Sequence, residues 1–277
     1  MRDLRDRVVV ITGAAGGIGR ALSLAFAREG SALALVDLDA SGLDGVHRDV
    51  VALGAQASRH TADVGDRQAL ERVRDEVLAR YGRVEVLVNN AGVTLYSLFE
   101  HLEPEEFERI VAVNFWGVVY GCQLFLPVLR NAGQAHIVNV SSMSGFAGMP
   151  FQSPYCATKF AVRGFTEALR AELDSVGIGV TCVMPGVTSS QILASARSRD
   201  PALTGRLGKL QLRHGGSPDK LARRIIRGVR WNSAEVRGQF DSVLLDLTKR
   251  AFPWLVGWFM AQLVRTASRR GLVRAKP

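Results

Sequence analysis

The feature that most restricts the fold of this chain is its first apolar run, together with the glycines that follow it. Residues 8–11 are all β-branched and are typical of a buried parallel strand. A glycine-rich stretch at 13–19 comes next, and residues 18–26 have the period of a helix that Gly30 should end. Strand, tight turn and helix in this order predict the first half of a βαβ unit.

The same alternation continues along the chain. Five more apolar runs predict strands at 32–37, 56–64, 84–88, 137–140 and 178–184. Helical patterns occur at 66–81, 103–130, from 154 onward and at 218–230. The prediction is an α/β fold with a single doubly wound, Rossmann-like parallel sheet, helices on both of its faces and an extra C-terminal helical tail.

The glycines of the first turn, Gly13, Gly17 and Gly19, would let the backbone come close to a ligand beside Ile18. The helix that follows would point unpaired N–H groups at the same place, which suits a pyrophosphate. The Gly-x-x-x-Gly-x-Gly spacing therefore predicts a dinucleotide site. The alternative is only a tight turn between a strand and a helix.

Asp37 ends the second expected strand, 20 residues after Gly17. A carboxylate there suits the ribose hydroxyls of an adenosine and repels a 2′-phosphate. The next residues, Leu38 and Asp39, are not basic, so we expect NAD as the cofactor, with NADP less favoured. The alternative for Asp37 is to cap the helix that begins near Ser41, a role for which Asp39 competes.

Tyr155 and Lys159 lie four residues apart on an expected helix, so they share one of its faces. Ser142 follows the strand at 137–140, at the sheet edge where ligands bind in open α/β folds. A free tyrosine has a pKa of about 10, and a neighbouring ammonium should lower it towards the range of an acid–base catalyst. The three side chains predict a catalytic site. The alternative is an ordinary pair of side chains on a helix surface.

Other strand ends carry polar or small residues. Asp63 and Val64 end the third strand. After the fourth strand, the two amides and small residues of Asn89-Asn90-Ala91-Gly92 suit either a backbone packed closely against a ligand or a structural turn. Asn114 lies among apolar residues within 103–130 and needs hydrogen-bond partners. It would either bond a neighbouring carbonyl or hold a water molecule that passes protons.

Composition is that of one globular domain. The 277 residues are 47% hydrophobic, and no linker or repeat divides them. The three cysteines lie apart in apolar segments, so we expect reduced core thiols and no metal site. The charged start of the chain is unlike a signal peptide, and no apolar run reaches the roughly 20 residues that span a bilayer. These features predict a cytoplasmic protein.

Positive charge is concentrated in the C-terminal part. Residues 197–277 hold 18 Lys or Arg and 5 Asp or Glu, a net charge of +13, against +9 for the whole chain. Such a segment can bind nucleic acid, an acidic surface or anionic lipid, or it can be a solvated face. No motif supports recognition of nucleic acid, so we expect no nucleic-acid partner.

Taken in order, the motifs resemble those of the short-chain dehydrogenase/reductase family, compact type. The matching motifs are Thr12-Gly13-x-x-x-Gly17-Ile18-Gly19, Asn89-Asn90-Ala91-Gly92, Asn114, Ser142, Tyr155-x-x-x-Lys159 and Pro185-Gly186. Ser142 precedes Tyr155 by 13 residues, as in the family. The resemblance covers roughly residues 5–190.

The resemblance implies hydride transfer between nicotinamide C4 and a carbinol carbon, with Tyr155 as the acid/base. Lys159 would lower the pKa of Tyr155 and bind the nicotinamide ribose, Ser142 would orient the substrate oxygen, and Asn114 would hold a proton-relay water. The family's threonine five residues after the proline, which contacts the carboxamide, falls at Ser190 here, with Thr188 and Ser189 nearby as alternatives. The implied cofactor-binding residues are Gly13, Gly17, Ile18, Gly19, Asp37, Asp63, Val64, Asn90, Ala91, Gly92, Tyr155, Lys159, Pro185, Gly186 and Thr188.

The family also implies a homodimer or homotetramer, because its members commonly pair the helix at 103–130 and the Tyr155 helix across a twofold axis. The C-terminal part departs from the family: many relatives end with a seventh strand and Val-Asp-Gly-Gly, and we expect neither here. Such endings resemble those of members that act on bulky lipophilic alcohols, steroid-like or retinoid-like. We expect residues 1–240 to form the catalytic and dinucleotide-binding domain, with 241–277 a basic and apolar helical extension of it.

The function expected from these features is an NAD-dependent oxidoreductase for a hydrophobic secondary alcohol or ketone. The alternatives are an NADPH-dependent carbonyl reductase and a nucleotide-sensing protein without catalysis.

Residues 252–264 form the most apolar part of the tail. Pro253 should begin a helix, with Leu255, Val256, Phe259 and Leu263 in one stripe and two tryptophans on the opposite side. A helix that is apolar all round is normally buried, so it would pack on a partner subunit or over the substrate pocket. The alternative is peripheral contact with a membrane, with tryptophan and phenylalanine in the interface and arginines on anionic headgroups.

Overall fold

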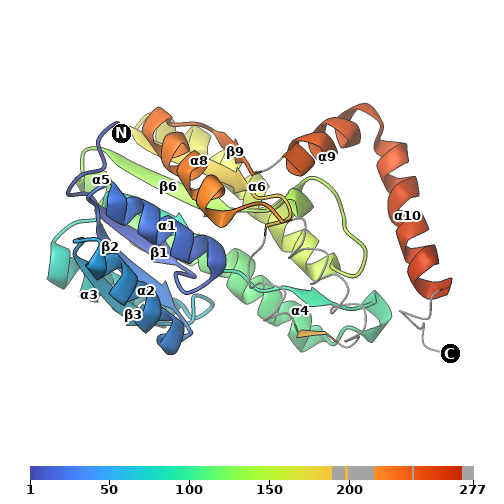
Figure 1. Ribbon diagram of the computed structural model, residues 1–277, viewed down its shortest axis with the longest axis horizontal. Coiled ribbons are helices and arrows are strands. Elements are labelled where there is room, and N and C mark those ends of the chain that lie inside the picture. The colour runs from blue at the N-terminus through green and yellow to red at the C-terminus, as the bar shows by residue number, and fades with distance from the viewer. Residues whose placement is uncertain (189–196, 199–214, 239, 270–277) are drawn as a thin grey trace.

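The computed structural model of the chain describes residues 1–188, 197–198, 215–238 and 240–269. Its main feature is a seven-stranded sheet in the order β3-β2-β1-β4-β6-β7-β9, in which every neighbouring pair is parallel (Figure 1). The strands are β1 (Val8–Thr12), β2 (Ala32–Asp37), β3 (Ala57–Thr61), β4 (Val86–Asn89), β6 (Ala135–Val140), β7 (Ile178–Met184) and β9 (Glu235–Arg237). The strand order reverses between β1 and β4, which opens a crevice at the carboxyl ends of the strands.

Helices cover both faces of the sheet, as predicted. One face carries α1 (Gly17–Arg28), α2 (Ala40–Ala52) and α8 (Pro218–Trp231). The other carries α3 (Arg67–Tyr81), α5 (Gly117–Asn131) and α6 (Ser153–Asp174). Helix α4 (Pro104–Val111) continues into α5 through one π-helical turn, η2 (Ala112–Trp116). Short elements near the carboxyl ends are β5 (Leu95–Tyr96), which pairs with β8 (Arg197–Ser198), η1 (Phe99–His101) and η3 (Met143–Gly145).

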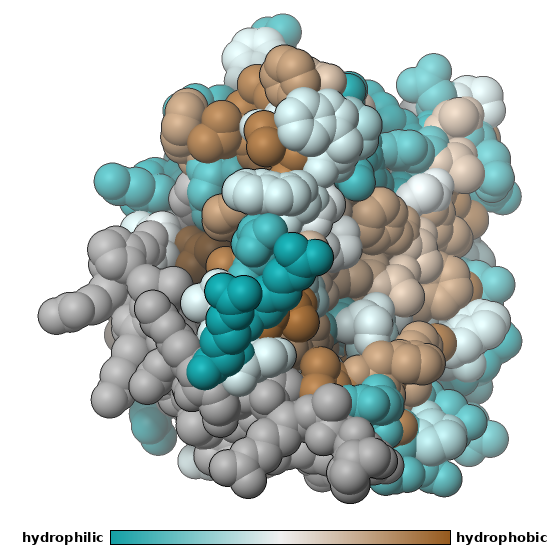
Figure 2. Space-filling view, turned by 90° about the vertical axis from the view of Figure 1, so that its right-hand side faces the viewer, coloured by the Kyte–Doolittle hydropathy of each residue, from teal (hydrophilic) through white to brown (hydrophobic). Residues whose placement is uncertain are grey.

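Two helices extend the fold beyond the edge of the sheet. Helix α9 (Phe240–Ala251) follows β9 and packs on η3, and α10 (Pro253–Arg269) turns away from α9 at the end of the molecule far from α2 and α3 (Figure 1). We call α9 and α10 together the C-terminal arm. Figure 2 shows the molecule from the side on which the arm lies.

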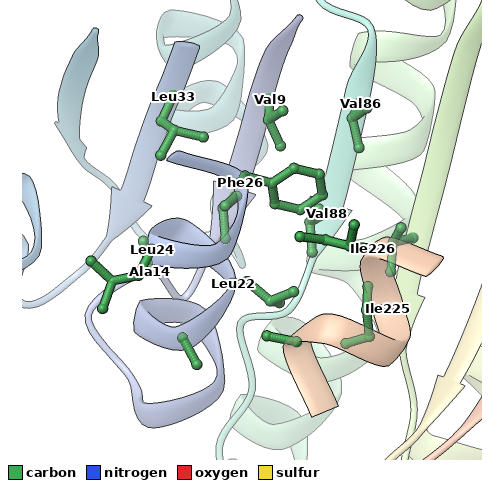
Figure 3. Close-up of a cluster of buried hydrophobic side chains, with 14 of the residues drawn as sticks. Val9, Ala14, Leu22, Leu24, Phe26, Leu33, Val86, Val88, Ile225 and Ile226 are labelled. Atoms are coloured by element: carbon green, nitrogen blue, oxygen red, sulfur yellow. The ribbon is translucent and has the colours of Figure 1, made fainter. Parts of the chain in front are cut away.

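The strands are apolar throughout because they are buried on both faces. Val9 and Ile11 of β1 face the core under α1 and α8, whereas Val8 and Val10 face the core under α3 and α5. In the first of these cores Phe26 of α1 packs between the sheet and α8 (Figure 3).

The expectation that the chain has no seventh strand is wrong. β9 pairs with β7 in parallel, with Cys182 opposite Glu235 and Met184 opposite Arg237. The strand has three residues and a single apolar one, Val236, so it has no apolar run for a sequence pattern to detect. The third strand also ends at Thr61, so Asp63 and Val64 lie in the loop after it.

Residues Pro104–Asn131 form one continuous helical run of 28 residues with a mean hydropathy of 1.5 over its most apolar part. Length and composition alone would allow such a helix to cross a membrane. In this protein 56% of that part is buried, and Val118, Cys122 and Phe125 pack on the sheet. The run is therefore a core helix that covers one face of the sheet.

Candidate active site

A cleft of about 750 Å³ opens at the carboxyl ends of the strands, on the side where the order of the sheet reverses. Sixteen of the residues predicted from the sequence line it: Gly13, Gly17, Ile18, Gly19, Asp37, Asp63, Val64, Asn90, Ala91, Gly92, Ser142, Tyr155, Lys159, Pro185, Gly186 and Thr188. Asn114 is fully buried behind the wall of the cleft. Ser189 and Ser190 lie outside the described residues.

The glycine turn between β1 and α1 is held tightly against the fourth strand. Gly13 has a φ of +65°, and a Cβ there would lie 2.7 Å from Cα of Ala91, so no other residue fits without a shift. The Asn90 amide donates to the carbonyls of Thr12 and Gly13, both at 3.0 Å. At the start of α1 the N-cap Gly16 has no side chain to cap the helix. The first backbone N–H groups of α1 are therefore open to an anion in the cleft.

Asp37 and Asp39 have separate roles. The Asp39 carboxylate accepts from the Gly42 N–H at 3.0 Å and caps α2, so the alternative in which Asp37 is the cap is wrong. Asp37 instead accepts from the Ala15 N–H at 2.9 Å and faces the cleft. Its carboxylate thus fixes the glycine turn and presents negative charge to whatever binds beside it.

Arg109 is a cleft residue that the sequence did not indicate. It reaches from α4 to Asp63, with 2.6 Å between Nη1 and Oδ2. No spacing links two residues so far apart in the chain, and only the fold brings them together. Among the described residues that line the cleft, Arg109 and Lys159 are the basic ones, so the pairing of Arg109 with Asp63 leaves no described cation beside Asp37.

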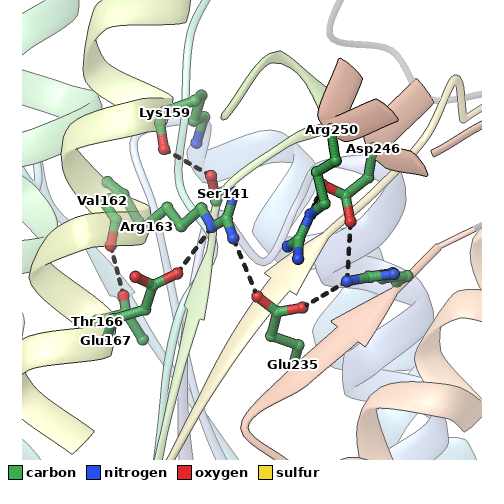
Figure 4. Close-up of polar contacts among 10 residues, drawn as sticks. Ser141, Lys159, Val162, Arg163, Thr166, Glu167, Glu235, Asp246 and Arg250 are labelled. Carbon is green, nitrogen blue, oxygen red and sulfur yellow. Dashed lines mark hydrogen bonds and ion pairs between the residues drawn. The ribbon is translucent and has the colours of Figure 1, made fainter. Parts of the chain in front are cut away.

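Tyr155, Lys159 and Ser142 meet at the inner end of the cleft. The Lys159 ammonium is buried, donates to the Val140 carbonyl at 2.9 Å and lies 5.6 Å from the centre of the Tyr155 ring. The Ser142 hydroxyl is hydrogen-bonded to the Tyr155 phenol and accepts from the Ser144 N–H at 3.1 Å. Ser141 fastens the end of β6 to α6 by donating to the Lys159 carbonyl at 2.7 Å (Figure 4).

The electrostatics of this group differ from the simple expectation. Burial raises the pKa of Tyr155 to about 12, although the hydrogen bond from Ser142 works in the opposite direction. Burial also lowers the pKa of Lys159 to about 8. Without a bound ligand, the Lys159 ammonium therefore does not bring the pKa of the Tyr155 phenol into the range of an acid–base catalyst, because desolvation is the largest effect on the pKa of both groups. At neutral pH the phenol holds its proton.

Asn114 lies in the π-helical turn η2 and bonds to protein atoms. Its side chain accepts from the Val93 N–H at 2.8 Å and donates to the Val93 carbonyl at 2.9 Å and to Thr158 at 3.2 Å. Thr158 precedes Lys159 on α6, so Asn114 joins three segments around the catalytic group. Of the two expected roles, bonding to a neighbouring carbonyl is the one that the structure shows.

The end of the cleft beyond Tyr155 has a mixed apolar and polar lining that no sequence pattern predicted. It is formed by Thr94, Tyr96, Met143, Ser144, Gln152 and Val187. Gln152 donates to Thr94 at 3.0 Å. Burial and the neighbouring Tyr155 raise the pKa of Tyr96, so this end also presents neutral hydroxyl and amide groups rather than charges.

Comparison with known proteins decides the family. The family model described as short chain dehydrogenase matches residues 7–201. The chain belongs to the short-chain dehydrogenase/reductase family. It is an oxidoreductase of the kind that acts on CH–OH donors.

Relatives cover nearly the whole chain. The putative oxidoreductase SadH of Mycobacterium tuberculosis is 39% identical over 254 residues, which is 90% of this chain and 92% of SadH. A short-chain dehydrogenase from Mycobacterium paratuberculosis bound to NAD is 26% identical with a TM-score of 0.77, covering 87% of this chain and 98% of that one. An alcohol dehydrogenase from Thermococcus sibiricus complexed with 5-hydroxy-NADP is 26% identical with a TM-score of 0.73, covering 84% and 96%. Structural neighbours thus bind NAD or NADP.

Proposed function

We propose that this protein is an NAD-dependent oxidoreductase that interconverts a hydrophobic secondary alcohol and its ketone. The observation that carries the proposal is the meeting of Tyr155, Ser142 and Lys159 at the inner end of a cleft whose other end has an open helix N-terminus and Asp37. One end suits proton transfer to an oxygen atom, and the other suits a dinucleotide.

Tyr155 and Ser142 act on the substrate oxygen in this proposal. The Tyr155 phenol is protonated at neutral pH because burial raises its pKa, so during reduction it donates its proton to the carbonyl oxygen and becomes the phenolate. In the oxidation direction the phenolate is the base: it takes the proton of the alcohol and becomes the phenol again. Ser142, already hydrogen-bonded to that phenol, holds the same oxygen in place. Lys159 places a buried positive charge beside the ring, which favours the phenolate at the moment it forms.

The residues of the cleft fit a nicotinamide dinucleotide. The open N-terminus of α1 would hold the pyrophosphate, Asp37 the adenosine ribose, Asp63 and Val64 the adenine, and Lys159 the nicotinamide ribose. Residues 90–92 and 185–188 would line the nicotinamide half. When bound, the nicotinamide supplies or accepts the hydride at C4.

The charges near Asp37 favour NAD. A 2′-phosphate at the adenosine ribose would meet the Asp37 carboxylate, and Leu38 and Asp39 offer it no cation. Arg109, the basic side chain on the same side of the cleft, is paired with Asp63. An NADP-binding site would need a free cation close to Asp37.

The direct test is a turnover screen of secondary alcohols and ketones with NAD, NADH, NADP and NADPH. We expect activity with NAD on lipophilic substrates and a loss of roughly 10²–10⁴-fold in kcat for Tyr155→Phe, which removes only the phenolic oxygen. NADH binding by the variant, followed by fluorescence, is the control and should be unchanged within about twofold. Turnover of Tyr155→Phe close to that of the wild type would overturn the role of Tyr155.

We also infer a homodimer or homotetramer built on α5 and α6. Trp116, at the end of η2, and Phe160 on α6 are exposed, and Trp116 stacks on Tyr120 with 5.5 Å between ring centroids. Exposed aromatic side chains of this kind are typical of buried interface cores. Sedimentation should show an oligomer that Phe160→Glu weakens; a monomer at every concentration would contradict the inference.

We place the enzyme in the cytoplasm, with contact to a membrane only at its surface. The proposed lipophilic substrate concentrates in membranes, so an enzyme that works beside one meets more of it. Cell fractionation at low and high salt would separate a cytoplasmic from a peripheral population.

A further inference from the structure

Helix α9 of the C-terminal arm is amphipathic, and its apolar side faces outward. Phe240, Leu244 and Leu247 recur at helical spacing and are 77%, 51% and 56% exposed. On the opposite side of the helix Ser242 and Asp246 are buried against the body of the protein. A surface helix of a water-soluble protein normally has the reverse orientation.

Ion pairs hold α9 in this orientation. The buried Asp246 carboxylate lies 2.9 Å from Arg237 of β9 and 2.9 Å from Arg250. Arg237 also pairs with Glu235 at 3.1 Å, and Glu235 pairs with Arg163 of α6 at 3.4 Å (Figure 4). Turning the leucines inward would remove Asp246 from Arg237, since only Arg250 lies on the same helix and moves with it. The loss of a partner is strongly unfavourable for a buried charge.

The first turn of α9 is also fixed to the wall of the cleft. The Asp241 carboxylate accepts from the Val187 N–H at 2.9 Å, and a Cβ at Gly238 would lie 2.8 Å from the Gly186 nitrogen. Gly186 and Val187 both line the cleft. Helix α9 therefore contacts the wall of the active-site cleft directly, while its apolar side faces outward.

Helix α10 continues the exposed apolar surface. Val256 and Ala267 are buried, but Trp254 and Trp258 are 70% and 58% exposed and Leu255 and Phe259 are exposed beside them. The helix begins at Pro253 as predicted, and Leu255, Val256, Phe259 and Leu263 fall on one side of it. The expectation that this stripe is buried is not met within the chain, because only Val256 of the four is buried.

We define the docking face by its six principal apolar residues, Leu244, Leu247, Phe252, Trp254, Trp258 and Phe259, all exposed. In Figure 2 apolar and aromatic side chains gather towards the top of this side of the molecule, with a strongly hydrophilic group below them. A contiguous exposed surface of this kind marks a binding site for a protein or a membrane.

The charge of the same segment distinguishes between these occupants. From residue 247 to the end the sequence has seven Lys or Arg and no Asp or Glu. Of these, Arg265 and Arg269 are described and exposed, whereas Arg250 is exposed but already paired with Asp246. A second copy of the chain would bring like charges together across the apolar face. An anionic lipid surface is complementary to them, and tryptophan prefers the boundary between headgroups and acyl chains.

We propose that the docking face binds the surface of an anionic membrane, with the α9–α10 corner in the headgroup boundary and the arginines on lipid phosphates. The inference rests on the proposed function only for the lipophilic nature of the substrate. It adds that the cleft is held next to the lipid in which such a substrate dissolves, because α9 contacts Gly186 and Val187.

The test is flotation of the full chain with vesicles of phosphatidylcholine alone and with about one third phosphatidylglycerol, at low salt. We expect binding to the anionic vesicles, weaker binding to the neutral ones, and at least a tenfold loss of binding for Trp254→Ser/Trp258→Ser. The matched control is Trp231→Ser, which alters an equally exposed tryptophan on the body and should bind like the wild type. Arg265→Glu/Arg269→Glu should weaken binding to anionic vesicles by roughly tenfold or more and leave the neutral ones unaffected.

Turnover of a water-soluble alcohol without vesicles separates this proposal from the proposed function. Trp254→Ser/Trp258→Ser should keep that turnover. Vesicle binding without turnover of any alcohol would sink the proposed function and leave the docking face. No binding by the wild type at low salt, or equal binding by the tryptophan variant, would overturn the docking face. So would self-association that the same substitutions abolish, because the occupant would then be a second copy.

Discussion

Helices α8 and α9 lie on either side of β9 in the chain, and each has a clear apolar side, yet they bury opposite sides. In α8 the apolar residues Leu221, Ile225 and Val229 are buried against the sheet, and Arg223, Arg224 and Arg227 face solvent. In α9 Leu244 and Leu247 face solvent and the carboxylate of Asp246 is buried. A periodic pattern therefore predicts a helix and the identity of its two sides, but not which side meets the protein. Which side is buried depends on whether the neighbouring elements offer an apolar surface or a charged partner, as Arg237 does for Asp246.

The difference between α8 and α9 can be tested by shortening one apolar side chain in each helix. Ile225→Ala in α8 should lower the free energy of unfolding by about 2–5 kcal/mol, because it leaves a cavity in the core. Leu244→Ala in α9 should change it by no more than about 0.5 kcal/mol, because the side chain is already in water. Urea denaturation of both variants measures the difference. Equal losses would mean that α9 is buried in solution.

A second prediction compares the buried charges of the two regions. Asp246 in the arm lies between two arginines. Lys159 in the body, by contrast, forms no ion pair with a carboxylate of the described residues. Burial lowers the pKa of Lys159 from 10.5 to about 8. Between these pH values the unfolded chain binds the proton and the folded protein does not, so Lys159 makes stability rise with pH across this window.

In Lys159→Met this contribution is absent. The difference in the free energy of unfolding, wild type minus variant, should therefore increase as the pH rises from 8 to 10.5. The expected increase is on the order of 1–3 kcal/mol. Denaturation curves at several pH values measure the gain. Parallel profiles for the two proteins would show that the ammonium is not destabilised by burial.

A smaller effect concerns Asp37, a half-buried carboxylate that faces the cleft. Asp37→Ala should reduce the preference for NAD over NADP by roughly tenfold, since the repulsion of a 2′-phosphate is lost. The measurement is kcat/KM with both cofactors. Asp66→Ala is the control: Asp66 caps α3 and does not line the cleft, so the change should lower stability by about 1 kcal/mol without changing the preference.

Much of the body could be predicted because its residues are under a single constraint. β2 and β7 begin and end at the expected residues, since each is an apolar run buried on both faces. β9 could not be found, because Glu235 and Arg237 serve ion pairs rather than the core. The helical tail itself was predicted, and α10 begins at Pro253 as expected. Its exposure was not, because an apolar helix is expected to be buried and α10 is largely exposed.

The active site was predictable wherever a residue type and a spacing carry the chemistry. Tyr155 and Lys159 are one helical turn apart, so their meeting follows from local geometry. Arg109 and Gln152 line the same cleft without any local signal, because their neighbours there come from distant parts of the chain. Burial could not be read from the motif either, and it is burial that sets the pKa of the phenol.

The π-helical turn at Ala112–Trp116 has a consequence for how this chain can be aligned and altered. A π-turn accommodates one residue more than an α-helical turn, so η2 amounts to a one-residue insertion in an otherwise continuous helix. Deleting one residue there would restore an unbroken α-helix while rotating everything before it by about 100° relative to α5. Asn114 would then leave the Val93 backbone. The length of this segment therefore matters as well as its side chains, and a related sequence with a gap at this point would have to hold the Val93 backbone beside α6 in another way.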